Sequence, residues 1–238
     1  MKFAVLLSGL LLLFLLPNWT ESVDTVDIST LARIINFFER NYKRVDTDGH
    51  PRQYAVAINV PKDQCQPDFY PEQNNFLTRE NAESVRNAIN DETNGLYQGE
   101  ELIAAGLKKI VISRKKQYYL HSESLLLNPP DNSPMTNLLN KIKDGCSVFY
   151  TFNSPCVDSC LNASRNHNIL EALRKWQEHD GIKAFVFRNI WGNDLGKDLQ
   201  TAFKKIAAHV PLFRCVSENQ CYACNREGNL PINAHCLT

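Results

Sequence analysis

Three side chains able to bind a metal ion, carried on two separate segments, constrain this chain more than any other feature. His121 lies in the string His-Ser-Glu, and Cys156 and Cys160 follow it 35 and 39 residues later. One imidazole and two thiolates fill three corners of a zinc tetrahedron and leave the fourth corner for water. Two sulfurs on one zinc ion lie roughly 3.8 Å apart, so the fold must bring both segments to a single point.

Glu123 follows His121 by two residues and is suited to move protons rather than to bind the metal. Zinc lowers the pKa of its bound water, so that hydroxide exists near neutral pH. A carboxylate that is not a ligand can take a proton from this water and pass it to a ring nitrogen of a substrate. The apolar run Leu125–Leu127 predicts a helix that begins here and directs His121 and Glu123 toward one pocket.

The two cysteines are separated by three residues and follow Pro155. Positions i and i+4 of a helix share one face, and proline suits the first turn of a helix. We therefore expect a helix to begin at Cys156, where the helix N-terminus favours the thiolate over the thiol. The alternative is structural, because two close cysteines in a secreted chain often form disulfides.

The order of these residues, His-x-Glu and then Pro-Cys with a second cysteine, resembles that of the zinc deaminases that act on nucleobases. The segment Cys146–Cys156 resembles the strand and Ser-Pro-Cys turn of the AID/APOBEC polynucleotide cytidine deaminases, a family in which the second cysteine spacing varies. Phe185–Asp194 resembles their next strand and the aromatic loop that touches the base beside the target. With its apolar N-terminus, the chain is most similar to the secreted AID/APOBEC-like deaminases, over residues 52–210.

This resemblance implies a fold, a metal and a reaction. The fold is a three-layer, cytidine deaminase-like α/β fold, with about five strands in a mixed sheet and helices on both faces. His121, Cys156 and Cys160 hold Zn2+, and Glu123 shuttles protons. The reaction is hydrolysis of cytosine to uracil in single-stranded DNA or RNA, because a duplex hides the amino carbon of the base. By family analogy, the role is defence against foreign nucleic acid.

Candidates for substrate binding lie just before the histidine and along the strands that lead to the pocket. They are Arg114, Lys115, Lys116, Phe152, Asn153, Arg188 and Trp191. The basic run either guides phosphates toward the metal or forms a solvated strand end. Trp191 either stacks on a flanking base or packs at a sheet edge. Residues 114–120 contain no asparagine, although this family commonly places one shortly before its zinc histidine to hold the sugar.

The formal net charge is zero, from 26 basic and 26 acidic residues. A dedicated nucleic-acid-binding protein is usually basic, so this balance argues against a long, tight footprint on a polymer. Two alternatives therefore stay open. One is deamination of free cytidine or deoxycytidine, and the other is a catalytically inactive, disulfide-stabilised secreted binding protein with a structural zinc.

Residues 1–22 are typical of a signal peptide. Lys2 is followed by the apolar run Phe3–Leu16, which is too short to span a bilayer. No later segment is long and apolar enough to cross a membrane. We therefore expect a secreted, extracellular protein that has no membrane anchor once the leader is cleaved.

Cysteine usage agrees with secretion. Two of the eight cysteines are candidate zinc ligands. The other six are expected to form three disulfides: Cys65, Cys146, Cys215, Cys221, Cys224 and Cys236. The pairing is not given by the sequence. Two alternatives concern the four cysteines from Cys215 onward. Together with His235 they could bind a second metal, or Cys221-Tyr-Ala-Cys224 could act as a redox motif.

The pattern divides the chain into a leader (1–22), a deaminase domain (23–214) and a cysteine-rich C-terminal tail (215–238). Strands are expected at 54–60, 107–113, 146 onward, 182–190 and 211–216, and further helices at 27–42, 79–90, 135–143, 169–179 and 194–210. The first two strands would pair as a hairpin, so 61–106 is an insertion between them. Asn162-Ala-Ser164 is a glycosylation sequon, which requires that the side chain of Asn162 face solvent.

Overall fold

A computed structural model of the chain describes residues 25–225 and 230–238. The strands are β1 (Ala55–Val60), β2 (Leu96–Gln98), β3 (Leu102–Ala105), β4 (Lys108–Ser113), β5 (Lys116–Leu120), β6 (Cys146–Asn153), β7 (Ile182–Asn189), β8 (Leu212–Ser217) and β9 (Gln220–Ala223). The helices are α1 (Ile28–Asn41), α2 (Ala82–Asn90), α3 (Ser122–Leu127), α4 (Pro134–Leu139), α5 (Leu170–Gln177) and α6 (Leu199–Ala207). Short 3-10 helices are η2 (Lys62–Cys65), η3 (Gly192–Asp194) and η4 (Ala234–Cys236).

The predicted leader, residues 1–22, lies outside the described residues. Among the residues that are described, no helix combines the length and apolar character needed to cross a membrane.

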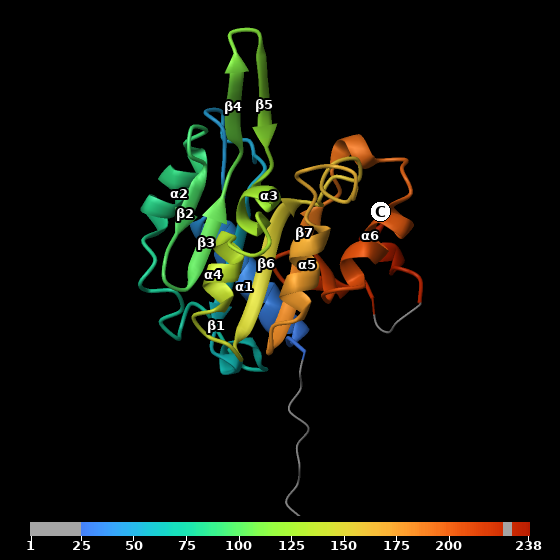
Figure 1. Ribbon diagram of the computed structural model, residues 1–238. Helices are drawn as coiled ribbons and strands as arrows, with labels where there is room; N and C mark the ends of the chain where they lie inside the picture. Colours follow the sequence, from blue (N-terminus) through green and yellow to red (C-terminus); the bar gives the residue numbers. More distant parts are fainter. Residues whose placement is uncertain (1–24, 226–229) are drawn as a thin grey trace, which may run out of the picture.

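A mixed sheet of seven strands, in the order β2-β3-β1-β6-β7-β8-β9, forms the centre of the molecule (Figure 1). β1 runs antiparallel to both β3 and β6. β6, β7 and β8 run parallel to one another, as strands joined by crossover helices do. The predicted α/β class with a mixed sheet is confirmed, and the sheet has seven strands where about five were expected.

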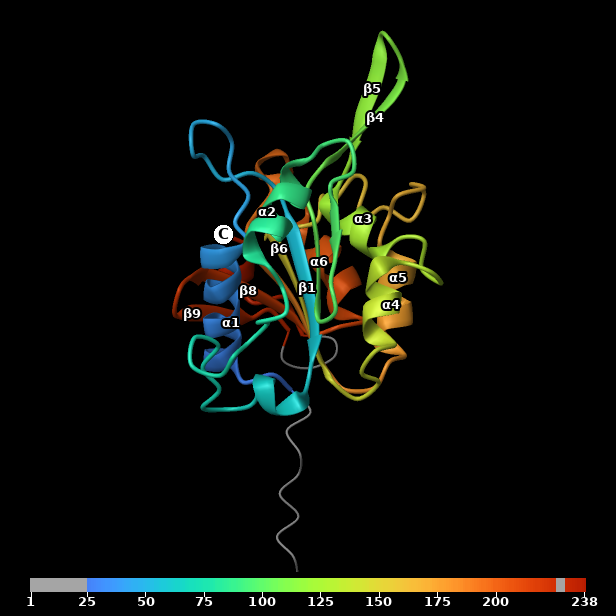
Figure 2. The same ribbon diagram turned by 90° about the vertical axis from the view of Figure 1, so that its left-hand side faces the viewer.

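Helices cover both faces of this sheet, which gives three layers. Figure 2 shows α1 and α2 on one side of β1, and α3, α4 and α5 on the other. Side chains along β1 alternate accordingly: Val56 and Ile58 pack in the core on the α1 side, and Ala55 and Ala57 in the core on the opposite side. This period of two is what a strand buried on both faces requires.

Helix α1 follows the predicted amphipathic pattern. Its side chains at helical spacing, Leu31, Ile34 and Phe38, are fully buried. Fully burying one such side chain stabilises the fold by about 1.5–3 kcal/mol. The helix begins after Asp27, whose Oδ1 accepts a hydrogen bond of 2.7 Å from the backbone N–H of Thr30.

The prediction that residues 107–113 form the second strand of the sheet is wrong. These residues contain β4, which pairs with β5 in a separate two-stranded sheet. The antiparallel partner of β1 is β3, which lies inside the segment 61–106 expected to be an insertion. β3 is buried at every residue, whereas most of β4 is exposed, and an interior strand must be apolar on both faces.

The β4–β5 hairpin projects from the body of the protein (Figure 1). Val111 and Ile112 in this hairpin expose 63% and 58% of their surface. The foot of the hairpin is Leu120, directly before the candidate metal ligand His121. The hairpin therefore extends the candidate site away from the core.

Three disulfides join the six cysteines expected to form them: Cys65–Cys146, Cys215–Cys221 and Cys224–Cys236. Cys221 and Cys224 are each bonded to another cysteine and not to one another, so this structure forms neither the Cys221-Tyr-Ala-Cys224 redox pair nor a second metal site on these four sulfurs. The tail is also not a separate unit, since β8 crosses the predicted boundary at residue 215 and pairs with both β7 and β9. Beyond β8, β9 forms one edge of the sheet.

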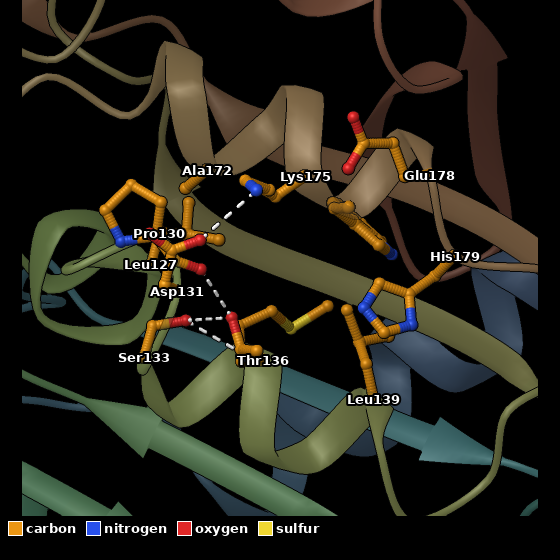
Figure 3. A pocket seen from close by; sticks show the side chains of 12 residues that line it. Leu127, Pro130, Asp131, Ser133, Thr136, Leu139, Ala172, Lys175, Glu178 and His179 are labelled. Atoms are coloured by element: carbon orange, nitrogen blue, oxygen red, sulfur yellow. Dashed lines mark hydrogen bonds and ion pairs between the residues drawn. The ribbon is translucent and has the colours of Figure 1, made fainter.

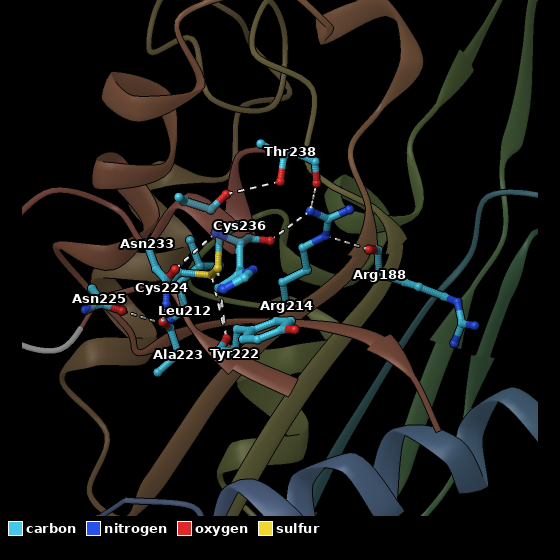
Figure 4. The surroundings of a disulfide bond; sticks show 12 residues. Arg188, Leu212, Arg214, Tyr222, Ala223, Cys224, Asn225, Asn233, Cys236 and Thr238 are labelled. Carbon is cyan, nitrogen blue, oxygen red and sulfur yellow. Dashed lines mark hydrogen bonds between the residues drawn. A yellow bond between two sulfur atoms is a disulfide. The ribbon is translucent and has the colours of Figure 1, made fainter. Parts of the chain in front are cut away.

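Figure 4 shows how the C-terminal residues are fixed around the Cys224–Cys236 disulfide. The guanidinium group of Arg214, on β8, donates hydrogen bonds to the backbone carbonyls of Arg188 at 3.1 Å and His235 at 2.9 Å. These bonds tie the last residues of the chain to β7 and β8. The C-terminal segment is thus part of the packed domain.

Candidate metal centre

The three candidate ligands meet at one point, as predicted. The Sγ atoms of Cys156 and Cys160 lie 3.4 Å apart, and they lie 3.5 and 3.4 Å from Nδ1 of His121. Ligands of one tetrahedral zinc ion are separated by roughly 3.8 Å when both are sulfur. Imidazole with two thiolates is a zinc donor set that keeps a fourth position open, so these residues fit the metal that the sequence implies.

The two segments reach this point in different ways. His121 follows the last residue of β5, has an extended backbone and is the N-cap residue of α3, so its ring is held where strand meets helix. Cys156 follows the end of β6, where the backbone N–H of Ser154 donates to the carbonyl of Asn189 at the end of the parallel neighbour β7. Both ligand segments therefore begin at the ends of strands.

The prediction of a helix beginning at Cys156 is wrong. Residues 156–168 form a succession of turns, and α5 begins only at Leu170. Polar side chains in this segment bond to the nearby backbone, as Asn162 Oδ1 does with the N–H of Ser164 at 3.0 Å. Such local bonds compete with the helical hydrogen-bond ladder. The thiolate preference at this site therefore has another cause than a helix N-terminus.

That cause is the hydrogen bonding among the ligands. The contact with Cys160 and then the bond to His121 lower the pKa of Cys156 to about 3. The same contact with Cys156, together with burial, raises the pKa of Cys160 well above its ordinary value. A metal ion binds both sulfurs as thiolates, so its binding would release the protons that they still carry.

Glu123 lies beside this centre and is 2% exposed. Its Oε1 accepts hydrogen bonds from Oγ1 of Thr151 at 2.9 Å and from Nε2 of Gln53 at 3.0 Å. Its Oε2 accepts one from Oγ of Ser122 at 3.2 Å. Burial raises the pKa of Glu123 above its ordinary value, as proton transfer near neutral pH requires.

Gln53 is the functional candidate that sequence reasoning missed. It precedes β1, and its Nε2 reaches Glu123 and Thr151 while its Oε1 accepts the backbone N–H of Asn153 at 2.9 Å. Gln53 therefore joins the carboxylate of α3 to the end of β6. The one sign of it in the sequence is a polar residue directly before a buried strand, a common feature that does not point to a site.

A pocket opens over the metal ligands. His121, Glu123 and Cys156 line it together with Tyr119, Asn153 and Trp191. Trp191 follows β7, as predicted, and its backbone N–H donates to Oγ of Ser154 at 3.0 Å. A wider groove adjoins this pocket, sharing Tyr119, Asn153 and Trp191 and adding Arg52. Asn153 and Trp191, two of the candidates for substrate binding, therefore line this pocket.

Two predicted substrate-binding residues do not reach the pocket. Phe152 points to the α1 side of the sheet, where its ring stacks on Tyr54 with centroids 6.1 Å apart. Arg188 lies 3.7 Å from the carboxylate of Glu39 on α1. Both alternate in sequence with neighbours that face the opposite side of the sheet, which is the side of the candidate metal ligands.

The three cations Arg114, Lys115 and Lys116 lie at the tip of the β4–β5 hairpin. Lys115 is six residues from His121, a span of roughly 20 Å in an extended strand. These cations line neither the pocket nor the adjoining groove, and they lie at the far end of the hairpin from His121.

A further pocket between α4 and α5 is separate from this site (Figure 3). Lys175 and Asp131 form an ion pair of 3.2 Å at its edge. It shares no lining residue with the pocket over the metal ligands.

A comparison with protein families identifies a match over most of the chain. The family model described as Secreted Novel AID/APOBEC-like Deaminase 1 matches residues 29–238. No curated protein and no solved structure matches the chain.

Proposed function

The chain belongs to the family of secreted AID/APOBEC-like deaminases, and from this membership we propose that it is a zinc-dependent enzyme that hydrolyses cytosine to uracil in single-stranded DNA or RNA. Foreign nucleic acid outside the cell is the substrate that secretion makes accessible, and a defence role is part of the proposal. The observation that carries it is the buried Glu123 beside the contact of His121, Cys156 and Cys160.

The metal supplies one part of the chemistry. His121, Cys156 and Cys160 would hold zinc, which would supply a water of lowered pKa. Glu123 would take a proton from water and give one to the ring nitrogen of cytosine, while the amino group leaves as ammonia. Water and cytosine are thus converted to uracil and ammonia, without any oxidation or reduction.

Neighbouring side chains prepare Glu123 for this role. Gln53 and Thr151 hold Oε1 of the carboxylate, so Oε2, which accepts only the longer bond from Ser122, is the oxygen that would carry the proton. Because the carboxylate is already oriented by two donors, no reorganisation is needed during the reaction. Asn153 and Trp191 at the mouth of the pocket are placed to contact the target nucleotide and a flanking base.

The charge of the β4–β5 hairpin favours a polymer over a free nucleoside. Residues 107–121 contain five basic residues and no acidic one. In the described part of the chain, none of these five cations forms an ion pair. Given the reach of the hairpin, cations at its tip are suited to phosphates several nucleotides from the target. A free cytidine molecule carries no phosphate for these cations to bind.

Deamination of free cytidine is the second candidate. It is favoured by the zero net charge of the whole chain and by the lack of an asparagine shortly before His121. An inactive binding protein is compatible with the three disulfides, but it gives no reason for a carboxylate buried beside the metal ligands.

The test is to incubate the mature, zinc-loaded protein separately with single-stranded DNA, single-stranded RNA and free cytidine. Conversion of cytosine to uracil is read by mass spectrometry, and bound zinc is measured on the same sample. Turnover of an oligonucleotide supports the proposal. Turnover of cytidine alone supports the second candidate, and zinc binding with no turnover of any substrate supports the inactive protein.

A further inference from the structure

The loop that carries Cys160 also carries a short sequence motif with no role in the metal site. Asn162-Ala-Ser164 is an acceptor sequence for N-linked glycosylation. The family to which the chain belongs is secreted, so the chain passes through the compartment where such acceptors are modified. Whether the asparagine is available depends on the local fold.

The backbone turns outward at this position. Leu161 is fully buried, and its carbonyl accepts a hydrogen bond of 2.9 Å from Nζ of Lys205 on α6. Asn162 is half-buried, and residues 163–167 are all exposed. Asn162 is therefore the point at which the chain leaves the core for the surface.

The side chain of Asn162 is held by its oxygen. Oδ1 accepts the backbone N–H of Ser164 at 3.0 Å, and the carbonyl of Asn162 accepts the N–H of Arg165 at 3.0 Å. Among the described residues, no hydrogen-bond partner is found for Nδ2. A half-buried amide nitrogen without a protein partner must bond to water, so Nδ2 faces solvent. This is the orientation that a glycan requires.

Asn162 is also outside the substrate path. It lines neither the pocket over the metal ligands nor the adjoining groove. A sugar chain on Nδ2 therefore does not displace a residue that is placed to contact the target base.

We infer that Asn162 is N-glycosylated in the secreted protein. In this step Nδ2 of Asn162 bonds to the anomeric carbon of a lipid-diphosphate-linked oligosaccharide. The bond between that carbon and the diphosphate oxygen breaks, the lipid diphosphate leaves with the electron pair, and Nδ2 loses one proton. The inference depends on secretion and is independent of deaminase activity.

The experiment is peptide mapping of the full-length protein secreted from eukaryotic cells that glycosylate a co-expressed secreted control. The peptide that contains Asn162 is compared before and after treatment of the folded protein with peptide-N-glycosidase, which releases the glycan and leaves aspartate. Mapping also separates Asn162 from the other sequon, at Asn18 in the predicted leader.

Matched variants test the assignment within the motif. Asn162→Gln and Ser164→Ala are both expected to abolish the modification, and Ser164→Thr to retain it, because the acceptor sequence needs a hydroxyl at this position. An unmodified Asn162 in the wild-type protein beside a glycosylated control overturns the inference. Since the wild-type map decides the question, a variant that fails to be secreted does not leave it open.

Discussion

Glu123 combines burial with two hydrogen-bond donors that come from other parts of the chain. A buried ionised carboxylate is costly unless donors surround it. Gln53 and Thr151 provide these donors, while burial still raises the pKa of Glu123. Burial thus favours the protonated form of Glu123, and the two donors favour its ionised form.

Replacement of this carboxylate gives the first prediction. Glu123→Gln keeps the side-chain shape and the acceptor oxygen but carries no transferable proton, so the turnover number should fall on the order of 100–10,000-fold. The zinc content and the melting temperature should not fall, because Glu123 is not one of the three candidate metal ligands. Glu83→Gln, on the exposed surface of α2, is the matched control. Undiminished turnover by Glu123→Gln excludes its proposed role.

Gln53 gives a second prediction at the same scale. Gln53→Met keeps the volume but removes the donor to Glu123 and the acceptor for the N–H of Asn153. Buried groups left without partners cost about 1–3 kcal/mol each. We expect the turnover number to fall at least about tenfold while zinc content stays the same. Gln73→Ala at the surface is the control, and a variant that changes only the melting temperature would show a purely structural role.

The residues at this site differ in how well sequence predicts them. His121, Glu123, Cys156 and Cys160 are recognisable because zinc accepts few side chains and their spacing is restricted. Gln53 donates to Glu123 across 70 residues of sequence, and no spacing rule governs a neutral amide at that separation. Phe152 and Arg188 were misplaced because strand periodicity defines two faces but not which of them meets the metal.

Among the elements, the β4–β5 hairpin has the clearest functional prediction. Arg114→Gln, Lys115→Gln and Lys116→Gln together should weaken oligonucleotide binding and reduce the salt slope by about 0.7 for each phosphate that is no longer neutralised. Cytidine turnover, where present, should change little. The triple variant Arg40→Gln, Lys143→Gln and Lys204→Gln removes the same charge elsewhere and is the control. If oligonucleotide binding depends equally on salt in both triple variants, the tip of the hairpin does not bind the nucleic acid.

The prediction of strands is wrong where a short segment is compatible both with a central strand and with a strand outside the sheet. Lys108–Ser113 contains three consecutive β-branched apolar residues, like a buried strand, yet it forms the exposed hairpin. β3 has only four residues, too few to show a period. Long, strongly amphipathic α1 was predicted almost to the residue, because four buried positions at helical spacing leave one arrangement.

At the scale of the whole molecule, the disulfides differ in the length of chain that they close. Cys65–Cys146 spans 81 residues and ties η2 to β6, whereas Cys215–Cys221 spans 6 within one hairpin. The prediction that six cysteines form three bridges is confirmed. Their pairing depended on which strands are neighbours, and so required the fold.

The loop lengths give a stability prediction. On loop-closure entropy alone, the first bridge stabilises the fold by about 4.5 kcal/mol and the second by about 2.3 kcal/mol. Cys65→Ala with Cys146→Ala should therefore lower the free energy of unfolding more than Cys215→Ala with Cys221→Ala. Urea unfolding of the zinc-loaded proteins measures both. A larger loss for the short bridge contradicts this ranking.

The β4–β5 hairpin adds no strand to the seven-stranded sheet and no side chain to either core cluster. Its sequence and length are therefore nearly free of the demands of folding, unlike those of β1 or β6. Evolution can lengthen, recharge or replace this arm while the chemistry at its foot stays intact. The same independence makes it a module for engineering, since a hairpin of different sequence can be exchanged into this position without a redesigned core.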